Sequence, residues 1–134
     1  MSDPALRGPS VDAAEDLHRF ITTPDWWVKN VHPLRPSPAS FDSPRFSVNI
    51  ASLTTIEEST RQLHQDLNCP RGGVVSFNCG VSRGLGFDSR QERDEKAPNN
   101  LAHAHVYYDG TSSSRKKNAR KLAALCETVS HPNF

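Results

Sequence analysis

The sequence predicts an α+β fold, in which a small antiparallel or mixed sheet is packed by about three helices, with long irregular connections in the N-terminal half. Residues 46–51 and 102–108 alternate apolar with polar or small residues, which is typical of half-buried strands. Other segments repeat apolar residues at three- and four-residue steps, which is typical of amphipathic helices. Most of the ten prolines lie in the N-terminal half and interrupt regular structure there.

Three main helices are expected along the chain. The first begins near Val11, because apolar residues recur at helical steps over the next three turns. The second begins near Thr55, where Thr54 and Glu57 have the spacing of a capping box. The third spans residues 114–126, and its apolar stripe predicts one buried face.

Three strands are expected, at residues 46–51, 74–77 and 102–108. One or two helical turns follow the second strand, with Asn78 as their N-terminal cap. Residues 88–100 are charged or polar with almost no apolar side chain, so we expect a loop there.

The amino-acid composition indicates what class of protein this is, but says little about its function. Sixteen basic and fifteen acidic residues give a formal net charge of +1, which favours neither a nucleic-acid partner nor a membrane surface. Three cysteines leave an odd thiol in any disulfide scheme, and no apolar run reaches the roughly 18–20 residues of a membrane-spanning helix. We therefore expect a cytoplasmic protein without membrane association. The predicted organisation is a flexible tail (1–10), one compact domain (11–127) and a C-terminal tail (128–134).

The strongest functional signal is a polar turn that leads into a helix opening on three cations. Natural helices favour acidic residues at their first turn, where unpaired amides carry partial positive charge. Here Ser112, Ser113 and Ser114 are followed by the three cations Arg115, Lys116 and Lys117 instead. A bound phosphate or carboxylate would be stabilised by these amides, hydroxyls and cations. The alternative is the solvated face of an amphipathic helix, since the segment lacks the glycines of a phosphate-binding loop.

A second signal is the His-x-His-x-Tyr pattern of His103, His105 and Tyr107. On a strand, these three side chains point to the same face. Paired imidazoles can bind a metal, transfer protons or hydrogen-bond a phosphate, and the alternative is a polar sheet face whose histidines bond their neighbours. If the protein is an enzyme, His103 or His105 is the predicted catalytic base. Tyr107 is predicted as a ligand contact, and no resident metal or cofactor is expected.

Four sequence blocks follow one another along the chain. They are Ser-Val-x-x-Ala-Ser-Leu-Thr at 47–54, Gly-Val at 73–74, Ala-His-Ala-x-Val at 102–106 and Ala-Arg-Lys-Leu-Ala at 119–123. This order resembles a group of small uncharacterised bacterial proteins, over roughly residues 26–126. The sequence departs from the group's pattern at Leu101, where proline is usual. The resemblance implies a bacterial, cytosolic, single-domain protein and no particular activity.

These observations predict a small recognition or accessory module that binds an anionic, phosphate-bearing ligand or a partner protein. The phosphate would belong to a nucleotide or a nucleic acid and would contact the serine turn, the cationic helix start and the histidine strand. The alternative is a small nucleotide- or RNA-directed enzyme, of the bacterial toxin or defence-associated type, that uses a histidine as general base. A structural subunit without a ligand is the third interpretation. The first two both place the histidines and the helix start in one site.

Overall fold

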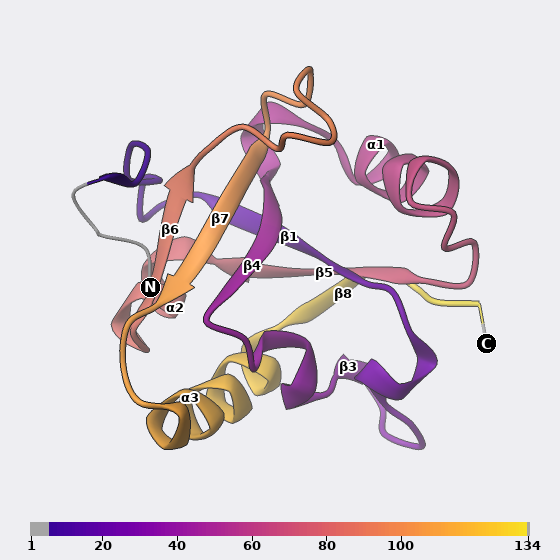
Figure 1. Cartoon of the computed structure of the whole chain (residues 1–134). Helices are drawn as coiled ribbons and strands as arrows, with labels where there is room; N and C mark the ends of the chain where they lie inside the picture. The colour runs from indigo at the N-terminus through magenta and orange to yellow at the C-terminus, as the bar shows by residue number, and fades with distance from the viewer. Residues whose placement is uncertain (1–5, 134) are drawn as a thin grey trace.

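The computed structural model describes residues 6–133, which form a six-stranded antiparallel sheet, a small second sheet and three α-helices (Figure 1). The strand order of the large sheet is β6-β7-β4-β1-β5-β8. Its strands are β1 (Asp16–Ile21), β4 (Arg45–Ile50), β5 (Gly73–Asn78), β6 (Phe87–Gln91), β7 (His103–Tyr108) and β8 (Glu127–Ser130). The small sheet pairs β2 (Trp27–Val28) with β3 (Arg35–Pro36). The α+β fold predicted from the sequence is confirmed.

The helices are short, apart from the last one. They are α1 (Ile56–Arg61), which continues as the π-helical turn η5 (Gln62–Asp66), α2 (Cys79–Gly84) and α3 (Ser112–Leu125). The expected cap of α2 is confirmed, because the Asn78 side chain accepts a hydrogen bond from the Val81 amide at 3.0 Å. The expected capping box of α1 is wrong by one residue. Thr55 is the cap, and its hydroxyl accepts from the Glu58 amide at 3.0 Å.

The hydrophobic core lies between one face of the large sheet and α3, whereas α1 lies on the other side (Figure 1). Side chains of alternate strand residues, such as Val48 and Val106, meet Leu122 of α3 in this core. The 3-10 turn η3 (Pro38–Phe41) adds Phe41, which is fully buried. We call the opposite surface of the sheet the polar face. It carries His18, Asn49, His103, His105 and Tyr107.

The helix expected from Val11 is wrong, because the second half of that segment is the strand β1. The helical spacing of its apolar residues is also compatible with a strand, since Leu17 and Ile21 are an even number of residues apart and share one face. β1 lies between β4 and β5 and pairs with both strands. The side chains of Leu17 and Ile21 are completely buried. Pairing on two sides outweighs the weak local preference for helix.

The expected loop over residues 88–100 is too long by four residues. Residues 88–91 belong to β6, which pairs with β7 along its whole length. Charged and polar side chains conceal this strand in the sequence. Asp88 and Arg90 point to the polar face and hydrogen-bond each other at 3.0 Å, whereas Phe87 and Ser89 are fully buried on the core face.

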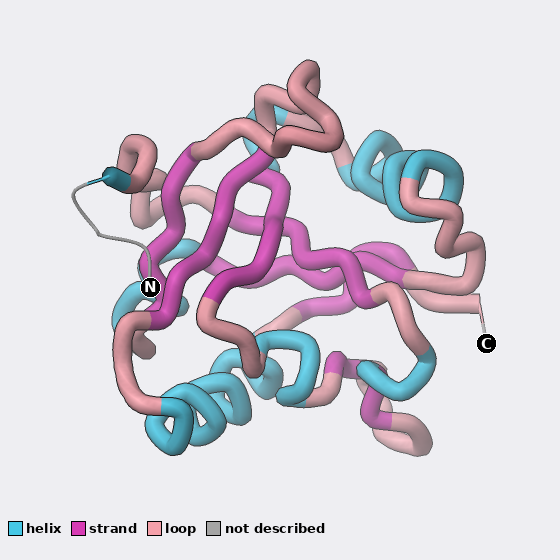
Figure 2. The backbone as a smooth tube through the Cα atoms, viewed as in Figure 1, coloured by secondary structure: helices cyan, strands magenta, loops and turns pink. Residues whose placement is uncertain are grey.

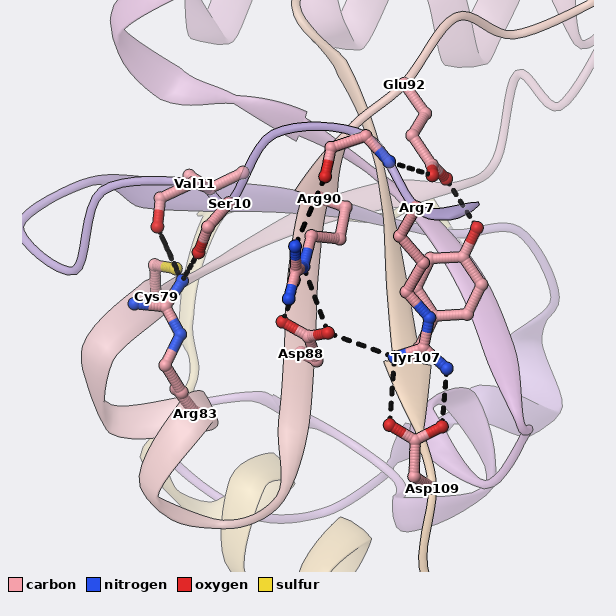
Figure 3. Close-up of polar contacts among 11 residues, drawn as sticks. Arg7, Ser10, Val11, Cys79, Arg83, Asp88, Arg90, Glu92, Tyr107 and Asp109 are labelled. Carbon is pink, nitrogen blue, oxygen red and sulfur yellow. Dashed lines mark hydrogen bonds and ion pairs between the residues drawn. The ribbon is translucent and has the colours of Figure 1, made fainter. Parts of the chain in front are cut away.

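Both expected tails are longer than the structure supports. Residues 6–10 pack against β6 and β7. Arg7 pairs with Asp88 at 3.0 Å (Figure 3), and the Gln91 amide donates to the Pro9 carbonyl at 2.8 Å. Residues 1–5 of the expected N-terminal tail lie outside the described residues. At the other end, β8 pairs with β5 as far as Ser130, beyond the expected domain boundary at 127. Within residues 6–133, no helix has the length and apolar character needed to span a membrane.

Candidate functional site

A pocket of about 580 Å³ opens on the polar face of the sheet. Residues of β1, β4 and β7 form its floor, and α1 with η5 forms one wall. The second wall is the loop of residues 94–100, which projects from the sheet beside the helical wall (Figure 2). The pocket therefore lies where three distant parts of the chain meet.

Three polar side chains form a row across the pocket floor. His18 of β1 pairs in register with Asn49 of β4, and Asn49 pairs with His103 of β7. Neighbouring strands lie about 4.8 Å apart, so the backbones of the two histidines are roughly 10 Å apart on either side of Asn49. Each of the three residues is at most 5% exposed. Buried polar groups require hydrogen-bond partners, so the partners of this row define the site.

Asn49 connects both walls of the pocket to the floor. Its Nδ2 donates to Ser59 Oγ of α1 at 3.2 Å and to Gln62 Oε1 of η5 at 2.9 Å. From the loop, Asn100 Nδ2 donates to Asn49 Oδ1 at 2.9 Å. Asn49 therefore positions the walls rather than offering a free group to a ligand.

His103 presents a ring nitrogen without a hydrogen-bond partner. Its Nδ1 lies 2.7 Å from the Glu92 carbonyl oxygen and must carry the proton, because a carbonyl only accepts. Nε2 of the neutral ring is then an unprotonated acceptor. It is buried and makes no hydrogen bond among the described residues, although Asp94 Oδ2 lies 4.0 Å away. Burial lowers the pKa of His103 below its ordinary value of 6.5, so the ring is neutral at pH 7.

His18 is held by the helical wall. Its Nδ1 lies 3.0 Å from Ser59 Oγ, which already accepts from Asn49. The Ser59 hydroxyl can donate to His18 Nδ1 or accept from it, so this contact is compatible with either tautomer of the neutral ring. Burial lowers the pKa of His18 as well. At neutral pH the row thus contains the acceptor ring nitrogen of His103 at one end.

Charged side chains line the walls of the pocket. Arg61 donates to Glu58 at 2.9 Å and to Asp66 at 3.1 Å, which neutralises its charge. Asp94 accepts from the backbone amide of Lys96 at 3.0 Å, and no lysine or arginine within residues 6–133 forms an ion pair with it. Three carboxylates and two cations leave the lining with a formal charge of −1 when both histidines are neutral. The pocket is therefore not a cationic anion site.

His105 and Tyr107 belong to a neighbouring cluster centred on Glu92. His105 Nδ1 lies 2.8 Å from Glu92 Oε1. The Tyr107 hydroxyl donates to the same oxygen at 2.5 Å (Figure 3). The other oxygen accepts from the Gly8 amide at 2.7 Å. Burial alone would raise the pKa of Glu92, but the hydrogen bonds from Tyr107, Gly8 and His105 lower it. These contacts attach the N-terminal segment to the sheet.

The serine turn and the cationic helix start lie on the opposite side of the sheet from the histidines. Ser114 Oγ lies 2.9 Å from the hydroxyl of Tyr108, whose ring belongs to the core. Arg115 donates to Asp42 at 2.8 Å, so its charge is already paired. The other predicted ligand contacts of this segment are exposed: Ser112, Ser113 and Lys116. The structure therefore does not bring the predicted histidines and the predicted helix start together.

Sequence reasoning missed His18, Asn49 and Asp94. His18 lies in the segment that the apolar spacing assigned to a helix, so its pairing with β4 was hidden. Asn49 did carry a signal, because it occupies a polar position in a correctly predicted strand. Asp94 lies in a charged loop, and no sequence pattern distinguishes it from the other carboxylates there.

Comparison with known proteins adds no assignment. No protein-family model matches the chain, and searches of curated proteins and of solved structures found no match either. Within residues 6–133, no group of three or more histidine, cysteine, aspartate or glutamate side chains is arranged to hold a metal ion. The function of the protein is therefore inferred from the geometry of the pocket.

Proposed function

We propose that this protein is a small recognition module that binds a compact polar ligand in the pocket between η5, α1 and the loop of residues 94–100. The observation that carries the proposal is Nε2 of His103, a buried acceptor without a partner on the pocket floor. An unsatisfied buried polar group costs about 1–3 kcal/mol, which a ligand donor would recover. The volume of about 580 Å³ falls within the range of roughly 300–1,000 Å³ that is typical of small-molecule sites.

This proposal keeps the recognition module that the sequence predicts but moves its site. At the start of α3, the pairing of Arg115 with Asp42 leaves less positive charge for a phosphate than the sequence implies. No polar side chain there is both buried and unpaired within the described residues. The pocket offers both a cavity and an unpaired buried acceptor, so it is the better supported site.

The test is thermal unfolding of the full chain with a panel of nucleosides, nucleotides, amines and inorganic phosphate. His103→Asn is the informative variant, because the asparagine amide replaces the Nδ1 donor to Glu92 and removes only the Nε2 acceptor. We expect at least one ligand of the panel to raise the melting temperature of the native chain and of Lys116→Ala by the same amount. The same ligand should bind His103→Asn about tenfold more weakly than it binds the native chain. Stabilisation that survives in His103→Asn and disappears in Lys116→Ala would move the site back to α3.

A second candidate function is an enzyme in which His103 is the general base. The specific observation is its tautomer, since the unprotonated Nε2 of this pocket-lining residue can take a proton from a substrate hydroxyl that reaches it. His105 is less suited to this role, because it does not line the pocket. Arg61 and Lys96 are the cations of the same pocket.

This candidate is tested with nucleotides and short RNA as substrates. We expect any turnover to fall at least about 100-fold in His103→Asn and much less in His105→Asn. The rate of the native chain should rise with pH with a midpoint below pH 6.5, because the base must be unprotonated and its pKa is lowered. Equal activity of the native chain and His103→Asn would exclude His103 as the base.

A further inference from the structure

The pocket contains a second acceptor beside His103, and we propose that Asp94 and His103 together select a ligand with a positively charged, planar nitrogen group, such as an amidinium or guanidinium. This inference rests on the proposed function of the pocket and names the class of ligand that the pocket takes.

The spacing of the two acceptors supports a shared donor. Asp94 Oδ2 and His103 Nε2 are 4.0 Å apart, which is too far for a hydrogen bond between them. A ligand nitrogen with two N–H bonds can lie about 2.9 Å from both atoms. A carboxylate could not bond this pair, because it has no hydrogen to donate. A phosphate would bring its negative charge next to that of Asp94.

The charges around the pair favour a cation. Asp94 is negative and His103 is neutral, so the pair carries one unit of negative charge. Arg61 does not offset it, because its guanidinium already bonds Glu58 and Asp66 on the opposite wall. Lys96 is the other cation of the lining, and it forms no ion pair with Asp94 among the described residues. Charge-assisted hydrogen bonds are roughly twice as strong as neutral ones, so a cationic donor gains more here than a neutral amine.

The position of Asp94 is fixed by the loop that carries it. The Ala97 amide donates to the Asp94 carbonyl at 3.1 Å, and the Asn100 amide donates to the Ala97 carbonyl at 3.0 Å. The side chain of Asn100 then bonds Asn49 on the pocket floor at 2.9 Å. Asp94 and His103 are therefore held by one continuous hydrogen-bonded network.

Protonation of His103 should abolish the site, since a charged imidazole would pair with Asp94 and repel a cation. The affinity for a cation should therefore fall as the pH drops below 6.5 towards the lowered pKa of His103. The ring of His105 lies 4.6 Å from that of His103 and is the closest group that can titrate with it on the strand. The other charged or titratable groups around His103 are Glu92 of the adjoining segment and the pocket-lining His18, Glu58, Arg61, Asp66, Asp94 and Lys96.

The test compares benzamidine with benzamide, which have nearly the same shape but differ in charge. The full chain is titrated at pH 7.5, and NMR signals of the His103 ring and of the Asn49 side-chain amide report on the pocket. We expect benzamidine to bind at least about fivefold more tightly than benzamide. Asp94→Asn should remove this preference. Glu95→Gln is the matched control, because Glu95 is an exposed carboxylate of the same loop that does not line the pocket.

Equal affinities for the two probes, or a preference that survives in Asp94→Asn, would overturn the inference. Adenosine, cytidine and inorganic phosphate are the comparison probes. If one of these shifts the pocket signals while benzamidine does not, the ligand class is wrong and the proposed function stands. If none of the probes shifts these signals, the inference and the proposed function both fail.

Discussion

Asn49 is the residue through which both walls of the pocket are joined to its floor. Replacing it with alanine leaves Ser59, Gln62 and Asn100 without their shared partner. We expect Asn49→Ala to lower the free energy of unfolding by about 2–3 kcal/mol, because several buried polar groups lose hydrogen bonds at once. Urea denaturation measures this change.

The matched control for that change is Asn99→Ala, at an exposed position of the pocket loop. It should change the free energy of unfolding by less than about 0.5 kcal/mol. Similar losses in the two variants would mean that Asn49 does not link the walls in the way its contacts indicate.

The two buried histidines also predict how stability depends on pH. The pKa values of His18 and His103 are lowered in the folded state, whereas the unfolded chain protonates near pH 6.5. Below pH 6.5 the unfolded state therefore binds more protons than the folded state. The free energy of unfolding must then decrease as the pH decreases, until the pH reaches the pKa values of the folded state. The contribution is complete above pH 6.5.

Melting temperatures between pH 7.5 and 5 measure this effect, and the His18→Asn/His103→Asn double variant should show a flatter profile. Carboxylates with a lowered pKa, such as Glu92 and Asp109, act in a more acidic window, below their ordinary values of 4.5 and 3.8. The same slope in the native chain and in the double variant would show that these histidines are not the source.

The sequence placed His103, His105 and Tyr107 on one face of a strand, and that placement is confirmed by β7. It did not distinguish the two histidines from each other. The difference arises from Glu92, whose carbonyl binds one ring and whose carboxylate binds the other. Glu92 follows β6, a strand that its charged residues concealed, so no local pattern predicted this contact.

At the scale of elements, the N-terminal segment is attached to the sheet mainly through Arg7 (Figure 3). The Arg7 side chain is 1% exposed and pairs with Asp88 and Asp109, and its guanidinium carbon lies 4.0 Å from the centre of the Tyr107 ring. Arg7→Ala would leave Asp109 without its paired cation and Asp88 with Arg90 alone. We expect a loss of about 2 kcal/mol in the free energy of unfolding, since Asp109 is half exposed and its share is screened.

Hydrogen exchange separates local from global effects of this change. The amides of Gly8 and Gln91 should exchange faster in Arg7→Ala. Their hydrogen bonds, to the Glu92 carboxylate and the Pro9 carbonyl, join the N-terminal segment to β6 and the residue after it. Arg120→Ala, at an exposed position of α3, is the control and should leave both amides protected. Unchanged exchange in Arg7→Ala would mean that the segment is held by its other contacts.

Element prediction succeeded where local signals and tertiary pairing agreed. The Asn78 cap, the strand 102–108 and the last helix are examples, since each combines a clear periodicity or cap with a buried face. β1 failed because its apolar positions fit both a helix and a strand, and only the neighbouring β4 and β5 decide between them. Such a decision depends on residues more than 25 positions away.

At the scale of the whole molecule, strand order creates the candidate site. β4 lies between β1 and β7, which brings His18 and His103 into one row although they are far apart in the sequence. The same order places α3 on the core face and α1 on the polar face (Figure 1). The histidines and the cationic helix start, which are close in sequence, are therefore separated by the sheet.

The measurement that tests the central claim most directly is the ¹⁵N NMR spectrum of the His103 imidazole at pH 7, with and without a ligand from the panel. The account predicts a protonated Nδ1 and an unprotonated Nε2 in the free protein, with the Nε2 signal moving when a ligand donates a hydrogen bond to it. A protonated Nε2 in the free protein, or ligand-induced shifts confined to residues 112–117 of α3, would contradict it.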